Sequence, residues 1–262
     1  MARDEMHSAD ARLTARPLAR ALVLTYGALV YLLFFGTFCY LIGWIADLVV
    51  PWTVDSGRPA SLGVTLGLDI GILALFAVQH TVMARRAFKD WWTRFVPQPI
   101  ERSTFVLFAV AILLLMVWQW RPLPEVVWQV DDGALAALLW ALYGLGWATV
   151  LISTILIDHF DLLGLKQTVF HALGRPCPAP EFEERLFYRH VRHPLMLGFL
   201  IAFWSAPVMT QGRLLFAVVT SAYTLIAIQI EERELVSIHG EDYESYRRRV
   251  PMLLPTGRRS SR

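Results

Sequence analysis

Ionisable side chains that could perform chemistry gather in three short blocks in the C-terminal half of a largely apolar chain. The first block, residues 158–167, begins with an Asp-His pair, and the second, residues 188–198, contains an Arg-His-Pro sequence. The third, residues 231–251, begins with two adjacent glutamates. An imidazole can exchange a proton near neutral pH, whereas guanidinium and carboxylate groups can bind the charged parts of a small metabolite. The blocks therefore indicate either a binding site or charges that pair at a membrane surface.

Six apolar segments must position these blocks. Hydrophobic residues make up 56% of the 262-residue chain and charged residues only 18%, less than a soluble domain of this length carries. The segments cover residues 21–50, 62–84, 104–120, 134–157, 195–209 and 214–230. A helix needs roughly 20 apolar residues to cross a membrane, and the last two segments are short and separated by a turn at 210–213. The prediction is an all-α polytopic membrane helical bundle of four spans plus a C-terminal helical hairpin, residues 195–230, without a Rossmann domain.

The distribution of positive charge predicts the orientation of the chain in the membrane. Arg and Lys are abundant in the N-terminal tail, in loop 85–102, in loop 158–194 and in the C-terminal tail. The two intervening loops have no such excess. Because cytoplasmic loops of membrane proteins are enriched in Arg and Lys, both termini should be cytoplasmic. The strong preference for Arg over Lys indicates a bacterial source, so we expect the bacterial inner membrane.

The hairpin should bring the second and third blocks to one face of the membrane, where basic side chains would meet the two carboxylates. The order of residues there resembles the C-terminal signature of the isoprenylcysteine carboxyl methyltransferase and phospholipid methyltransferase superfamily. The matching residues are Arg192-His193-Pro194, Gly198, Glu231-Glu232, Gly240, Tyr243, Tyr246 and Pro251. The chain has Met196 where the superfamily often has Tyr, a departure expected to reshape the pocket.

Motifs outside the hairpin resemble those of the bacterial methanethiol S-methyltransferases, a group adjacent to the NnrU-like membrane proteins. They are Val50-Pro51-Trp52-Thr53-Val54-Asp55, Gln79-His80-Thr81-Val82-Met83-Ala84-Arg85, Val96-Pro97, Glu101-Arg102-Ser103 and Asp158-His159-Phe160-Asp161-Leu162. The resemblance implies one membrane-embedded methyltransferase domain over residues 1–262, with residues 158–262 as its cytoplasmic-side cofactor-binding part. It also implies S-adenosyl-L-methionine as methyl donor, methanethiol as acceptor and dimethyl sulfide as product.

The resemblance further implies which residues bind the cofactor. They are Gln167, Tyr188, His190, Arg192, His193, Pro194, Leu197, Gly198, Glu231 and Glu232. The guanidinium of Arg192 could hold the carboxylate of the cofactor in a two-pronged pair. The two glutamates could accept hydrogen bonds from its ribose hydroxyls or its amino group.

Polar residues in or near the membrane are the candidates for the acceptor site. Asp69 and His80 are eleven residues apart, close to three helical turns, so they share one helix face. Ionisable residues inside a membrane helix are functional candidates because their burial is costly. We predict Asp158, His159 and His80 as catalytic residues, and Asp69, His80 and His159 as substrate-binding residues. Alternatively, His80 is interfacial, and Asp158 with His159 caps the C-terminus of the preceding helix.

Other interpretations of the same residues remain open. His190 and His193 beside the glutamate pair suggest a metal site, but Pro194 argues against a regular helix there and no cysteine cluster accompanies them, so no metal is predicted. The acceptor could instead be a prenylated cysteine carboxylate or a phospholipid amine, or the protein could be a non-enzymatic NnrU-like membrane protein. The expected partners are a small thiol and the lipid bilayer, without nucleic acid, and the oligomeric state is open.

Overall fold

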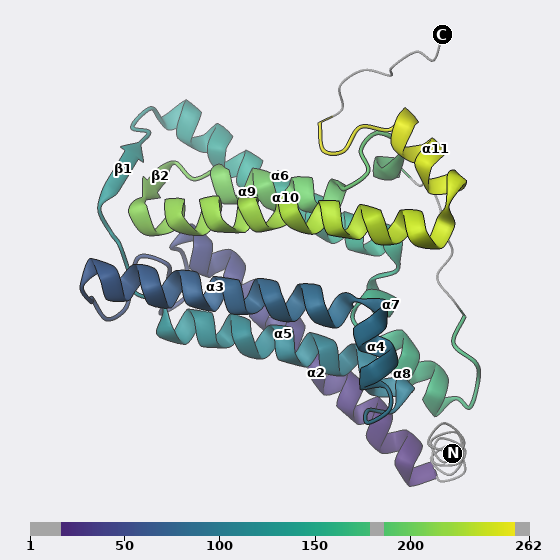
Figure 1. Ribbon diagram of the computed structural model, residues 1–262. Helices are drawn as coiled ribbons and strands as arrows, with labels where there is room; N and C mark the ends of the chain where they lie inside the picture. Colours follow the sequence, from purple (N-terminus) through teal and green to yellow (C-terminus); the bar gives the residue numbers. More distant parts are fainter. Residues whose placement is uncertain (1–16, 179–185, 255–262) are drawn as a thin grey trace. The chain divides into compact units, whose positions relative to one another are not determined.

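The structure, a computed structural model, describes residues 17–178 and 186–254 and consists mainly of helices (Figure 1). Among these residues, five helices are long and apolar enough to cross a membrane: α2 (Pro17–Ala46), α3 (Leu62–Ala84), α5 (Gln98–Gln119), α6 (Gly133–Ile157) and α10 (Gln211–His239). A further apolar helix, α9 (Pro194–Trp204), is shorter. The protein is therefore an all-α polytopic membrane protein, as predicted from its apolar segments.

The chain folds into two compact units that alternate along the sequence. The first unit takes its described residues from Met1–Trp44, Leu66–Trp120 and Asp158–Glu181. The second takes them from Ile45–Thr65, Arg121–Ile157 and Phe182–Arg262. The first block of ionisable residues thus belongs to the first unit, whereas the second and third blocks belong to the second unit.

In the first unit, helices α2, α3 and α5 contribute to one apolar core. Its buried residues are Val30, Met83, Phe105, Val106, Val110 and Leu163. Three short helices complete the unit: α4 (Arg86–Trp92), α7 (His159–Leu162) and α8 (Leu165–Ala172). Gly164, between α7 and α8, has a φ of 85°, and a Cβ atom there would lie 2.5 Å from the backbone nitrogen of Ser103. Glycine is therefore needed where this connection crosses α5.

In the second unit, α9 packs along α6 through two glycines (Figure 1). A Cβ atom on Gly198 would lie 2.7 Å from the carbonyl oxygen of Gly146, and one on Gly146 would lie 2.7 Å from the backbone nitrogen of Ala202. Small residues let two membrane helices approach until their backbones touch. This contact holds the first turns of α9, which carry part of the predicted site, against a spanning helix.

Replacing Gly198 by Ala should therefore destabilise the protein. The added methyl group would press on backbone atoms, which cannot rotate away, and overpacking of this kind costs about 1–3 kcal/mol. The measurement is the thermal unfolding midpoint in detergent. Gly144→Ala is the matched control, because a Cβ atom at Gly144 meets nothing within 4 Å. Equal midpoints for the two variants would show that the glycine contact is not close.

The turn of the predicted hairpin differs from the expectation. Residues 210–213 are not a turn, because β2 (Val208–Thr210) pairs in antiparallel fashion with β1 (Val126–Gln129), and α10 begins directly afterwards. The side chain of Thr210 caps α10 by accepting a hydrogen bond from the backbone nitrogen of Arg213. Hydropathy alone did not reveal this arrangement, since a polar Thr-Gln-Gly-Arg sequence serves a helix start as well as a turn.

The strand pair explains how the chain can cross the membrane although helix α9 is too short to span it alone. Pairing of β1 with β2 places the starts of α6 and α10 at the same end of the second unit (Figure 1). The 11 residues of α9 span about 16 Å, less than the roughly 30 Å of a hydrocarbon core. The non-helical residues 205–210 supply the remaining length. The chain thus runs along α9 towards the β1–β2 strand pair, reverses there, and runs back along α10.

A buried arginine fixes the beginning of α10. Arg213 has only 7% of its side chain exposed, and its Nε atom lies 2.9 Å from Oδ2 of Asp55. Its terminal nitrogens donate to the carbonyl oxygens of Val208 at 2.8 Å and Ala46 at 3.3 Å. A buried guanidinium is tolerated only when it is paired and hydrogen-bonded in this way. Arg213, which was expected in an exposed turn, is therefore a buried residue that ties the start of α10 to Asp55.

The other end of α10 lies further along the chain than predicted. The apolar run ends at residue 230, but the helix continues to His239 and carries Glu231 and Glu232 within it. Hydropathy stops at the first charges, whereas Glu, Arg and Leu all favour a helix and prolong it. The glutamate pair therefore occupies fixed positions on a helix. The chain then turns into α11 (Glu241–Arg249).

Candidate functional site

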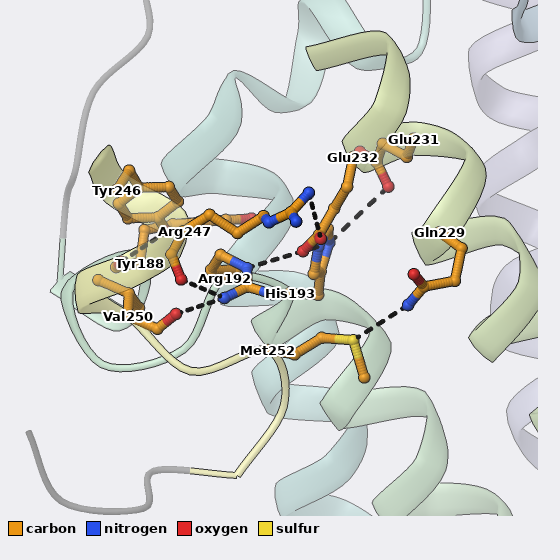
Figure 2. A network of polar contacts seen from close by, with 10 residues as sticks. All are labelled: Tyr188, Arg192, His193, Gln229, Glu231, Glu232, Tyr246, Arg247, Val250 and Met252. Carbon is orange, nitrogen blue, oxygen red and sulfur yellow. Dashed lines mark hydrogen bonds and ion pairs between the residues drawn. The ribbon is translucent and has the colours of Figure 1, made fainter. Parts of the chain in front are cut away.

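The turn before α9 presents the Arg-His-Pro sequence. A short 3-10 helix, η1 (Leu186–Arg189), precedes this turn, and Pro194 is the first residue of α9. Proline suits this position because its ring fixes a helical φ and its missing N–H is not needed there. Arg192 and His193 consequently stay outside the helix, and their side chains reach α10 (Figure 2).

A single buried carboxylate joins these two side chains. Glu232 lies on α10 with only 5% of its side chain exposed. Its Oε1 atom accepts a hydrogen bond from Nε of Arg192 at 2.7 Å and lies 3.0 Å from Nε2 of His193. A carboxylate is costly to bury unless basic or donor groups surround it, and these two side chains meet that need. We call Arg192, His193, Glu231 and Glu232 the Glu232 cluster.

The C-terminal segment of the second unit lies against the same turn. Nη1 of Arg192 donates to the carbonyl oxygen of Val250 at 2.5 Å. The backbone nitrogens of Arg192 and His193 donate to the carbonyl oxygens of Pro251 at 2.9 Å and Met252 at 3.1 Å. These backbone acceptors carry no side-chain signature, so sequence reasoning missed them, apart from the proline of the motif. The cluster is thus held from both sides, by α10 and by the chain after α11.

The second carboxylate of the pair is the accessible one. Half of the Glu231 side chain, 51%, is exposed, and its Oε2 atom lies 3.8 Å from Nδ1 of His193. Figure 2 shows Glu231 and Glu232 leaving α10 in different directions, as expected for adjacent helical residues. The half-buried Tyr188 lies nearby, and its pKa is raised by burial and by the charge of Glu231. The side chain of His190 is exposed to solvent.

The remaining predicted cofactor residues of this unit shape the start of α9. Pro194 begins the helix, and the backbone nitrogen of Leu197 donates to the carbonyl oxygen of His193 at 3.0 Å. Gly198 provides the close contact with α6 described above. The structure gives each of them a local packing or hydrogen-bonding role, which keeps the Glu232 cluster in place.

In the first unit, Asp158 caps a helix, but not the one expected. It does not cap the C-terminus of the preceding helix but is the N-cap of α7, where it accepts a hydrogen bond from the backbone nitrogen of Asp161. Nζ of Lys166 lies 2.7 Å from its Oδ2 atom. Burial alone would raise the pKa of Asp158, but these hydrogen bonds hold it below its usual value. The φ of Asp158 is 120°, a strained value for a residue with a side chain.

His159 and Gln167 flank this ion pair. Nε2 of His159 lies 3.2 Å from the hydroxyl oxygen of Tyr31, and the two rings meet edge to face. Burial lowers the pKa of His159, which favours the neutral form of its imidazole. The side-chain amide of Gln167 donates to the carbonyl oxygen and the carboxylate of Asp161. A neutral imidazole in a fixed orientation can accept a proton.

His80 contacts aromatic rings within the first unit. Its ring lies 5.3 Å from that of Phe76 and 5.0 Å from that of Phe105, measured between centroids. Asp69, on the same helix α3, is fully buried. The guanidinium of Arg102 lies 4.8 Å from the centroid of the Phe105 ring, on α5. The aromatic ring of Phe105 thus lies close to both an imidazole and a guanidinium.

Arg102 was not among the predicted site residues. It was assigned to a loop because the apolar run begins only at residue 104, but α5 begins at Gln98. Pro99 and Glu101 in the first turn are signals of a helix start, since proline fits the first positions and a carboxylate favours the helix N-terminus. Reading these signals would have placed Arg102 on the helix.

Comparison with known proteins decides the family. The model of the NnrU protein family matches residues 70–250. The chain belongs to the NnrU protein family. The family expected from the motifs is thereby confirmed. No solved structure matches the chain.

Two relatives of this NnrU-family protein share a name, and a third, more distant relative has another. Methanethiol S-methyltransferase of Mycobacterium tuberculosis is 52% identical over 238 residues, which cover 91% of this chain and 98% of the relative. Methanethiol S-methyltransferase 1 of Bradyrhizobium diazoefficiens is 48% identical over 251 residues, which cover 96% of this chain and 88% of the relative. Nurim of Sus scrofa is 29% identical over 201 residues, 74% of this chain and 73% of the relative.

The NnrU-family protein thus has two groups of ionisable residues, each described within its own unit. The second unit holds the Glu232 cluster with Tyr188, and the first holds Asp158, His159 and Gln167 together with His80 and Asp69 on α3. Within the described ranges, no group of three or more His, Cys, Asp or Glu side chains could hold a metal ion.

Proposed function

We propose that this protein is an S-adenosylmethionine-dependent methyltransferase that converts methanethiol into dimethyl sulfide. The observation that carries the proposal is the identity of 48% and 52% to two methanethiol S-methyltransferases over 96% and 91% of this chain. The ordered Glu232 cluster, which contains part of the superfamily motif, also supports it. A thiol substrate also suits a membrane protein, since methanethiol is small and apolar.

The Glu232 cluster fits a donor of this kind. S-adenosylmethionine has an ammonium group, a carboxylate and ribose hydroxyls, and the half-exposed carboxylate of Glu231 can accept hydrogen bonds from the ammonium or the hydroxyls. Arg192 already donates to Glu232 and to backbone carbonyls, so we assign it to ordering the cluster instead of binding the donor's carboxylate. When bound, the donor supplies a methyl group on a sulfonium, which a thiolate can displace in line.

The residues of the first unit are suited to preparing the acceptor. A thiol reacts as the thiolate, so a base or a nearby positive charge is needed near neutral pH. Burial favours the neutral form of His159 by lowering its pKa, and Tyr31 orients its ring. His80 is the second histidine of this unit. Asp158 is bound by Lys166, so we assign it to fixing the backbone beside His159.

The proposal includes the orientation and location of the protein. The Arg-rich tails and loops support a cytoplasmic position for both termini, in a bacterium whose inner membrane holds the helices. This orientation puts the Glu232 cluster at the cytoplasmic face, where a polar, water-soluble donor is available.

The test is the purified protein in detergent or lipid nanodiscs. It should bind S-adenosylmethionine in a calorimeter and produce dimethyl sulfide from methanethiol, measured by gas chromatography of the headspace. A farnesylcysteine analogue and phosphatidylethanolamine serve as competing acceptors. If one of these acceptors were methylated and no dimethyl sulfide formed, that acceptor and not methanethiol would be the substrate. If the protein neither bound the donor nor formed any methylated product, a non-enzymatic role would remain for this NnrU-family protein.

A further inference from the structure

Two polar groups beside the ring of Phe105 have hydrogen-bonding or charge capacity that their described neighbours leave partly unused. Nδ1 of His80 is buried, and within the described residues it has no hydrogen-bond partner. The guanidinium of Arg102 donates from Nε to the carbonyl oxygen of Leu162 at 2.8 Å. In the same ranges no carboxylate lies within 4.0 Å of this guanidinium. Glu101 and Asp161 act on the guanidinium only from beyond ion-pair distance. An imidazole nitrogen without a described hydrogen-bond partner and a guanidinium without a close ion pair, both beside one aromatic ring, indicate a ligand.

The chemistry of these groups matches a small thiol. A guanidinium beside a low-dielectric, aromatic surface stabilises an anion more strongly than it would in water. Sulfur makes favourable contacts with aromatic rings, and Phe105 and Phe76 both flank His80. A methyl group on the sulfur could make apolar contacts with the same rings. The ligand that fits is a small, apolar thiol that becomes an anion on binding.

Resting on the proposed function, we infer that His80 and Arg102 form the thiol-activating site. The thiol S–H bond breaks, its proton goes to Nδ1 of His80, and the electron pair stays on sulfur beside Arg102. That pair forms the new bond to the methyl carbon, and the donor sulfur keeps the pair of the bond that breaks. Arg102 contributes a charge that lowers the free energy of the thiolate, as positive groups do for reactive cysteines.

A structural role for Arg102 makes a different prediction. Its hydrogen bond to Leu162 pins α7 against α5, and loss of that bond would impair the enzyme equally at every pH. Loss of thiolate stabilisation would matter most at neutral pH, where few thiol molecules are ionised. At higher pH the thiolate forms in solution, and the charge becomes less necessary. The pH dependence therefore separates the two roles.

The experiment compares Arg102→Met with wild type at pH 7 and pH 9, using methanethiol and headspace detection of dimethyl sulfide. We expect a loss of about 100-fold in kcat/KM at pH 7, as removal of one stabilising donor in an active site often gives, and a loss at least tenfold smaller at pH 9. Arg102→Lys keeps the charge and should retain most of the activity. Arg94→Met is the matched control, because Arg94 is exposed in the same unit.

Each outcome decides the inference. Equal losses at both pH values, or a loss in Arg102→Lys as large as in Arg102→Met, would overturn it. Calorimetric binding of S-adenosylhomocysteine shows whether each variant is folded; if Arg102→Met is not, His80→Gln takes its place, with its largest loss also expected at pH 7. Wild-type protein without dimethyl sulfide production would overturn the proposed function, and this inference with it. Active wild type with unimpaired variants would overturn the inference alone.

Discussion

Replacing Glu232 by Ala should abolish donor binding and lower the thermal unfolding midpoint by on the order of 10 °C. The side chain is buried and joins Arg192 to His193, so its removal leaves two basic groups without their partner. Breaking a buried ion pair from one side costs about 3–5 kcal/mol. Intrinsic tryptophan fluorescence in detergent measures the midpoint, and calorimetry with S-adenosylhomocysteine measures binding.

The neighbouring glutamate provides the matched control. Glu231→Ala removes a half-exposed carboxylate, so the unfolding midpoint should change little, whereas donor affinity should fall at least tenfold. If both variants unfolded at the same temperature, the buried pairing would contribute nothing to stability. If Glu231→Ala bound the donor as wild type does, the donor site would have to lie elsewhere.

Ending the chain at Arg249 should also abolish donor binding, although it removes no ionisable residue of the predicted site. The truncation deletes the carbonyl groups of Val250, Pro251 and Met252, which accept hydrogen bonds from Arg192 and His193. Without them the turn before α9 loses one of its two supports, and the basic side chains can leave the orientation that reaches Glu232. Calorimetric titration of the truncated protein measures the effect.

A chain that ends at Leu254 is the control for this truncation. It keeps all three carbonyl acceptors and should bind the donor as tightly as the full chain. Adding a synthetic peptide of residues 250–254 to the shorter form should not restore binding, because a short peptide pays the entropy of association. Donor binding by the form ending at Arg249, at the affinity of the full chain, would show that α10 alone orders the cluster.

The spanning helices could be predicted from the sequence because the requirement is simple. A run of about 20 apolar residues has one solution in a bilayer, and five such helices are present in the described ranges. The meeting of Arg192 and His193 with Glu232 was also foreseeable, since a returning hairpin brings its two ends together. Charge and order of residues, rather than any single motif, carried that prediction.

The remaining features depend on contacts that hydropathy does not encode. The β1–β2 pair uses backbone groups, which every residue has, so a Val-Met-Thr segment between two helices gave no warning of it. The helical position of Arg102 was not predicted, because a charged residue just before an apolar run resembles a loop residue. That position follows from capping signals, and the contact of Arg102 with Phe105, three residues later on the same helix, follows from the helical repeat. The contact of His80 with Phe105 joins two helices, and only the folded structure shows it.

Helix α10 has a charged residue buried near each end. Arg213 is paired with Asp55 at one end, and Glu232 is paired with Arg192 at the other. The 19 residue steps from Arg213 to Glu232 correspond to about 28 Å of helix, close to the thickness of a hydrocarbon core. Such a helix cannot shift along its own axis or alter its hydrophobic length to suit a thinner or thicker bilayer. Lipids around this protein must therefore adjust to the helix, so acyl-chain length becomes a determinant of its stability.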